Sequence, residues 1–136
     1  MGQEKIRILI IDDEENILQV MRQALQREGY ETDTVLDALK GLSILSSSEY
    51  DLVLCDIAMT RMNGIEFFRE IEERLPGMAD RILFMTGGIL SPSIQKFLKE
   101  RRVSIIEKPF DFLTLFQGVH NALQRSSGEK SFFSQD

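Results

Sequence analysis

Cysteine and histidine are almost absent from the sequence, which has one of each in 136 residues. The single Cys55 cannot form an internal disulfide bond, and with the single His120 it cannot build a Cys/His zinc site. These absences exclude a disulfide-stapled domain and a zinc module of that kind. They favour a reducing, cytoplasmic location.

Long hydrophobic runs are lacking as well. No apolar stretch approaches the roughly 20 residues that a membrane-spanning helix needs. The first apolar run, Ile6–Ile11, is too short for a signal peptide and continues directly into acidic residues. We therefore expect neither a membrane span nor secretion.

Basic residues are fewer than acidic ones. The chain has 16 Lys and Arg against 22 Asp and Glu, which gives a formal net charge of -6. Such a balance repels a phosphate backbone at long range. Direct binding of nucleic acid is not expected.

What the sequence does contain is an alternation of strand-like and helix-like segments. Near-continuous apolar runs are typical of strands that are covered on both faces, and Glu31–Val35, whose polarity alternates, is expected at an edge. The runs are Ile6–Ile11, Leu52–Cys55, Arg81–Met85 and Val103–Ile106; the helical segments are Glu15–Glu28, Ala38–Leu45, Ile65–Leu75, one that starts at Ser91-Pro92, and about Phe112–Gln124. This order predicts one α/β domain with a five-stranded parallel sheet and five helices on its two faces.

Polar residues follow four of the five predicted strands. Asp12 and Asp13 follow the first, Asp56 the third, Thr86 the fourth and Lys108 the fifth. Ligand sites of open parallel sheets lie beyond the carboxyl ends of the strands, so we expect these side chains to meet. Three carboxylates repel one another unless a cation joins them, and hard oxygen ligands suit Mg²⁺.

This set of groups also suits phosphoryl transfer. An ammonium, a hydroxyl and a metal around one carboxylate can stabilise the charge of a phosphoryl group in transfer. Asp56 is the predicted nucleophile, and it would form an aspartyl phosphate. Each residue alone is also typical of a turn or of the first turn of a helix. The function is therefore indicated by the four strand ends together.

The segments that carry these residues resemble the receiver domain of bacterial two-component response regulators. The resemblance covers about Lys5 to Arg125. The matching segments are Ile10–Glu14, Asp51–Met59, Met62–Gly64, Met85–Gly87 and Glu107–Phe110. It implies a flavodoxin-like, doubly wound sheet in the order 2-1-3-4-5 and a receiver domain over residues 1–125. Residues 126–136, rich in serine, are expected to form a disordered tail or linker.

By this resemblance, Asp56 accepts a phosphoryl group from a histidine kinase or a histidine phosphotransfer protein. Asp13, Asp56 and the backbone carbonyl of Ala58 would hold Mg²⁺, and Asp12 would join through water. Lys108 would pair with the phosphoryl oxygens.

The resemblance also implies a switch. Thr86 would move to hydrogen-bond the phosphoryl group, and the domain would change conformation to regulate an output protein or domain. Many receivers carry an aromatic ring or histidine where this chain has Ile105, and many carry proline where Thr60 stands. We therefore expect the switch to act through Thr86 and the adjacent Gly87-Gly88 segment, with small changes at Ile105.

Other functions fit less well. A phosphatase that resembles the haloacid dehalogenase family needs a second acid two residues after the nucleophile, where this chain has Ala58. A flavin or nucleotide binder needs glycine or hydroxyl residues after the first strand, where this chain has acids. We expect a phosphoacceptor that catalyses only its own phosphorylation and dephosphorylation. The alternatives are a receiver fragment of a hybrid sensor histidine kinase and a pseudo-receiver interaction module.

Overall fold

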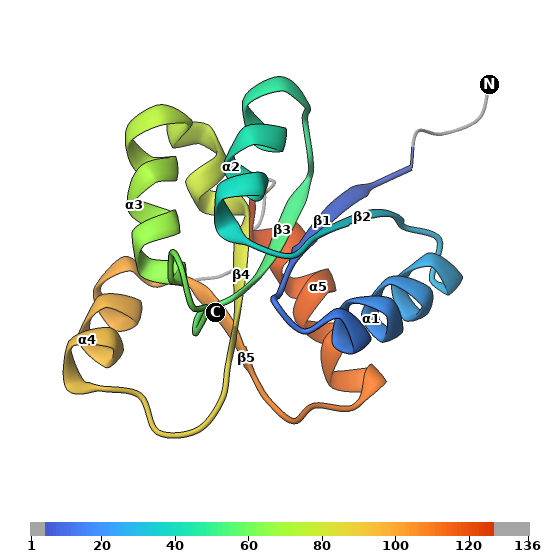
Figure 1. Ribbon diagram of the computed structural model, residues 1–136. Helices are drawn as coiled ribbons and strands as arrows, with labels where there is room; N and C mark the ends of the chain where they lie inside the picture. Colours follow the sequence, from blue (N-terminus) through green and yellow to red (C-terminus); the bar gives the residue numbers. More distant parts are fainter. Residues whose placement is uncertain (1–4, 127–136) are drawn as a thin grey trace.

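The computed structural model describes residues 5–126, which form one layer of strands between two layers of helices (Figure 1). The elements in chain order are β1 (Arg7–Ile11), α1 (Glu15–Arg27), β2 (Glu31–Val35), α2 (Ala38–Ser47), β3 (Leu52–Asp56), α3 (Gly64–Arg74), the 3-10 helix η1 (Pro76–Arg81), β4 (Ile82–Thr86), α4 (Pro92–Arg101), β5 (Ser104–Glu107) and α5 (Phe112–Ser126).

The five strands form one parallel sheet in the order β2-β1-β3-β4-β5. The predicted fold class and strand order are confirmed. The chain steps outward from β1 to β2 and then returns past β1 to β3. This reversal places a crevice beyond the carboxyl ends of β1 and β3, where ligands of such sheets bind.

Alternation along the strands divides the core between the two faces of the sheet. In β1, Ile8 and Ile10 belong to one hydrophobic core with residues of α1 and α5, whereas Leu9 and Ile11 belong to another with residues of α2, α3 and α4. Figure 1 shows α1 and α5 together on one side of the sheet and the other three helices on the opposite side. Cys55 is buried in the second of these cores, and burial raises the pKa of its thiol well above the usual value. Cys55 is therefore a small core residue.

The helix ends follow the expected local chemistry. The side chain of Ser91 accepts a hydrogen bond from the N–H of Ile94 at the start of α4, with Pro92 as the first helical residue. Gly29, which follows α1, has a φ of 96°, a conformation that favours glycine. The predicted start of α4 is confirmed, and α1 ends at Arg27, one residue before the predicted Glu28.

Most boundaries differ from the sequence prediction by one or two residues; Asp56 and Thr86, expected just after strands, are the last residues of β3 and β4. Arg81, expected in a strand, ends the 3-10 helix that Pro76 and Gly77 begin. Ser126, expected as the first residue of the tail, is the last residue of α5, and the rest of the tail lies outside the described residues. Within residues 5–126, no helix combines the length and the apolar character needed to cross a membrane.

Candidate functional site

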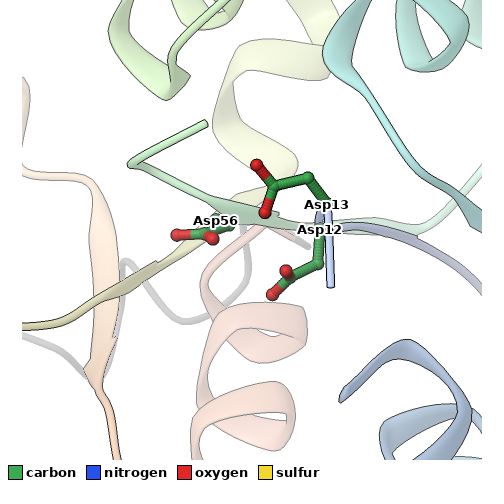
Figure 2. A group of neighbouring side chains, drawn as sticks. All are labelled: Asp12, Asp13 and Asp56. Carbon is green, nitrogen blue, oxygen red and sulfur yellow. The ribbon is translucent and has the colours of Figure 1, made fainter. Parts of the chain in front are cut away.

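Three carboxylates meet at the carboxyl ends of β1 and β3. Asp12, Asp13 and Asp56 each offer an oxygen atom, and these atoms lie within 4.8 Å of one another (Figure 2). The parallel register pairs Ile11 with Cys55, so the next residues of the two strands, Asp12 and Asp56, come side by side. Asp12 and Asp56 are buried and Asp13 is exposed. The cluster therefore has a shielded interior and an open side.

Lys108 reaches this cluster from the loop after β5. Its Nζ donates hydrogen bonds to Oδ2 of Asp12 at 3.1 Å and to Oδ2 of Asp56 at 3.3 Å. The backbone N–H of Lys108 donates to the carbonyl oxygen of Thr86 at 2.6 Å. One ammonium is thus shared by the two buried carboxylates.

The remaining oxygen of each buried carboxylate is held by a backbone N–H two residues further along. Oδ1 of Asp12 accepts from the N–H of Glu14 at 2.9 Å, and Oδ1 of Asp56 accepts from the N–H of Ala58 at 3.1 Å. These donors were missed at the level of sequence. The signal for them is the tendency of aspartate at a strand end to accept a hydrogen bond from its own chain two residues on.

Burial and charge shift the protonation of the central groups. Burial raises the pKa of the Asp56 carboxyl above its usual value and the charge of Asp12 adds to this, while the Ala58 N–H and the Lys108 ammonium oppose it. Burial by itself lowers the pKa of Lys108, but the charges of Asp56 and Asp12 together outweigh burial and hold that pKa above its usual value. Lys108 is therefore a fixed positive charge at neutral pH.

The donor set fits a divalent cation. Three carboxylates face one ammonium, which leaves an excess of negative charge in the crevice. Hard carboxylate oxygens with one open side match the ligands that Mg²⁺ takes in proteins.

Thr86 and Ile105 occupy different environments. Thr86 ends β4 and is 3% exposed, whereas Ile105 is 44% exposed in the middle of β5. After Thr86 the chain opens into Gly87, Gly88 and Ile89, all exposed, and Gly88 has a φ of 67°. Thr86 ends a buried strand that is paired with β3, and the three residues that follow it are exposed.

Comparison with known proteins identifies the family. The model of the response regulator receiver domain matches residues 8–120. The sequence is 32% identical over 127 residues to the transcriptional regulatory protein GlrR of Escherichia coli (strain K12), and the match covers 93% of this chain and 28% of GlrR. The chain therefore spans less than a third of the length of that relative.

Two solved receiver structures cover nearly the same length as this chain. The receiver domain protein of Methanospirillum hungatei JF-1 superposes with a TM-score of 0.82 at 29% identity, over 93% of this chain and 99% of that one. The response regulator TrrA of Thermotoga maritima, solved in complex with Mg²⁺ and BeF, superposes with a TM-score of 0.72 at 32% identity, over 86% and 98% of the two chains. The fold, the position of the acidic cluster and these matches agree, and the chain belongs to the response regulator receiver domain family.

Proposed function

We propose that this receiver domain accepts a phosphoryl group on Asp56 from a histidine kinase or a histidine phosphotransfer protein, and that the modified domain regulates an output protein or domain. The observation that carries the proposal is the environment of Asp56. One buried carboxylate shares the Lys108 ammonium with Asp12 and borders Asp13. A metal ion held by carboxylates, together with an ammonium, is needed around a phosphoryl group in transfer. The cluster does not serve stability, because the like charges of the three acids oppose folding.

In this proposal the chain supplies the nucleophile and positions it. A bond forms between an Asp56 carboxylate oxygen and phosphorus, and the bond between phosphorus and the donor imidazole nitrogen breaks, with the electron pair leaving on nitrogen. The Ala58 N–H holds Oδ1 of Asp56, which fixes the rotation of the carboxylate. Lys108 keeps its ammonium against the same carboxylate, where it can pair with the phosphoryl oxygens.

Asp13, Asp56 and the carbonyl of Ala58 are the proposed Mg²⁺ ligands, with Asp12 joining through water. The ion, when bound, neutralises charge on the phosphoryl oxygens during transfer. The support is the excess negative charge of the cluster, together with the Mg²⁺ and BeF complex of the related TrrA.

The proposed domain is a phosphoacceptor and not a turnover enzyme. Ala58, two residues after Asp56, offers no acid or base for a second chemical step. Thr86 is the proposed switch hydroxyl that turns toward the phosphoryl group. The free, buried thiol of Cys55 fits our placement of this function in the cytoplasm.

The surface beside the acceptor suits a protein donor. A groove of about 580 Å³ borders Lys108 and is lined mainly by apolar side chains from α1, the loop before α5 and the start of α5; among them are Ile17, Val20, Met21, Pro109 and Phe112. Val20 and Phe112 are each 51% exposed. Exposed apolar surface next to a reacting group can hold a partner protein in place during transfer.

Phosphorylation by a small donor tests the function. Acetyl phosphate with Mg²⁺ is expected to add one phosphoryl group to the chain, measured as intact mass, and Asp56→Asn is expected to abolish the adduct. Asp80→Asn is the matched control, because Asp80 is an exposed aspartate on η1, at the opposite end of β4 from Thr86. An adduct that persists in Asp56→Asn would overturn the assignment of the acceptor. A wild-type chain that takes no phosphoryl group would favour an interaction module instead.

A further inference from the structure

The loop between β3 and α3 contains no proline, the residue whose ring would fix the backbone φ angle. The conformation of this loop therefore depends on its contacts with neighbouring residues. Ala58 in this loop is exposed, but the residue before it, Ile57, is 2% exposed. The N–H of Ile57 donates to the carbonyl oxygen of Met85 at 3.0 Å, and the carbonyl oxygen of Ile57 accepts from the N–H of Gly64 at 2.9 Å. Ile57 is therefore held from β4 on one side and from the first residue of α3 on the other.

Gly64 makes this approach possible because it has no side chain. A Cβ atom at Gly64 would lie 2.8 Å from Cα of Ile57, 2.9 Å from Cε1 of Phe84 and 3.0 Å from Cγ1 of Ile57. The first of these neighbours is backbone and cannot rotate away. Any larger residue at this position has to push Ile57, and with it Ala58, away from the start of α3.

A reciprocal pair of hydrogen bonds fixes the start of α3 itself. Oδ1 of Asn63 accepts from the N–H of Glu66 at 2.9 Å, and Oε1 of Glu66 accepts from the N–H of Asn63 at 3.0 Å. This capping box holds the residue that precedes Gly64. The contact between Gly64 and Ile57 is thus supported from the helix.

The geometry points to Gly64, supported by the Asn63–Glu66 pair, as the residue that positions Ala58 for cation binding. The inference rests on the proposed function, in which the Ala58 carbonyl holds Mg²⁺ while the Ala58 N–H holds Oδ1 of Asp56. The atoms nearest to a Cβ at Gly64 belong to Ile57 and Phe84, and Gly64 is not among the proposed ligands. It acts through Ile57, as outer contacts around a metal site orient the ligands that touch the metal.

Titration with Mg²⁺ alone, followed by backbone amide chemical shifts, tests this role without a phosphoryl donor. Gly64→Ala is expected to weaken Mg²⁺ binding by about tenfold or more, a typical size for the loss of an outer contact. Gly118→Ala is the matched control. A Cβ atom there would lie 2.6 Å from Cγ2 of Ile106, on the α5 side of the sheet, so it also disturbs packing but away from this loop. The control is expected to bind Mg²⁺ like the wild type.

A milder pair of variants keeps the test decisive if Gly64→Ala does not fold. Glu66→Ala removes the hydrogen bond from the Asn63 N–H to Oε1 of Glu66, while the bond from the backbone N–H of residue 66 to Asn63 remains, and it is expected to weaken Mg²⁺ binding by about threefold. Glu66→Gln also removes the charge but keeps an oxygen acceptor, and it is expected to restore wild-type affinity. Equal weakening in both Glu66 variants, equal weakening in Gly118→Ala, or unchanged affinity in a folded Gly64→Ala would overturn the inference. A wild-type chain that binds no Mg²⁺ would overturn the proposed cation site as well.

Discussion

Two regions that supply the candidate site are packed differently. β1 and β3 carry the acids, and all five residues of β3 are buried, as are four of the five in β1. α4 and β5 flank the other side of the site, and they bury only Phe97, Leu98 and Ile106. The loop that leads into α4 exposes Ile89 completely.

The acids therefore lie on a rigid part of the protein, β1 and β3, whereas α4 and β5 belong to a part that can move. A carboxylate that must take up a cation and a phosphoryl group at one place benefits from a rigid frame, which strands buried on both faces provide. A region that must change shape has to come from the less stable part of a structure. The α4–β5 region meets that condition, because few apolar side chains anchor it.

The largest expected effect comes from the residue that links the two regions. Lys108→Ala removes the ammonium shared by Asp12 and Asp56, so phosphoryl uptake from acetyl phosphate should fall by about a hundredfold. Lys96→Ala is the control, because Lys96 is exposed and pairs within α4 with Glu100. A Lys108→Ala rate equal to that of the control would show that the ammonium does not assist transfer.

Mg²⁺ should stabilise the acidic side of the site. A ligand that binds only the folded state adds about 2 to 3 kcal/mol to the free energy of unfolding at a hundred times its dissociation constant. Without the ion, Asp13→Asn should raise the melting temperature, because it removes one of three mutually repelling charges. With the ion, the gain on adding Mg²⁺ should be smaller in Asp13→Asn than in the wild type. Melting temperatures that do not change with Mg²⁺ in either the wild type or Asp13→Asn would contradict the prediction.

A pH dependence is expected just before β3, at the end of that strand opposite Asp56. The Tyr50 hydroxyl donates to Oδ2 of Asp33 at 2.6 Å, and burial, with this bond and the charge of Asp33, raises the pKa of Tyr50 to about 12 despite Arg7. Between pH about 10 and 12 the unfolded chain releases the phenol proton first. The stability from this contact is therefore complete below pH 10 and is lost as the pH rises toward 12.

Urea unfolding of Tyr50→Phe measures that contribution. At pH 8 the variant should lose about 1 kcal/mol, the net size of a typical hydrogen bond, because the Asp33 side chain is partly exposed. The difference between the variant and the wild type should shrink as the pH rises above 10. A difference that stays constant up to a pH of about 11.5 would contradict the expected loss of stability on ionisation of the phenol.

A smaller effect is expected where α4 is fastened to α3. The guanidinium of Arg101 contacts both carboxylate oxygens of Glu72, each at 3.3 Å, and lies 5.3 Å from the ring centroid of Phe97. Arg101→Ala should cost less than about 1 kcal/mol, because the pair is partly exposed. Amide hydrogen exchange should rise in α4 and not in β1 or β3. The control is Arg74→Ala, whose ion pair with Glu70 stays within α3.

The fold and the acidic cluster could be predicted because both follow from positions along the chain. Strand-length apolar runs order the sheet, and the polar residues after them, such as Asp12 and Asp56, reach the same edge. The close approach of Gly64 to Ile57 could not be predicted, because it depends on where α3 begins in space. The contact of Arg101 with Glu72 was missed for the same reason, since it joins two helices that are separate in sequence.

The smallest effect is expected at Ile105. Its side chain is branched at Cβ and has one strongly preferred first torsion, and it has no hydroxyl to exchange between a buried partner and water. Beryllofluoride with Mg²⁺, a mimic of the phosphoryl group on Asp56, should therefore shift the amides of Thr86–Leu90 strongly and that of Ile105 little. Gly88, at a φ of 67°, lies in the segment that has the backbone freedom for this movement. Large shifts centred on Ile105, with Thr86–Leu90 unmoved, would show that β5 carries the signal and that the loop after β4 does not.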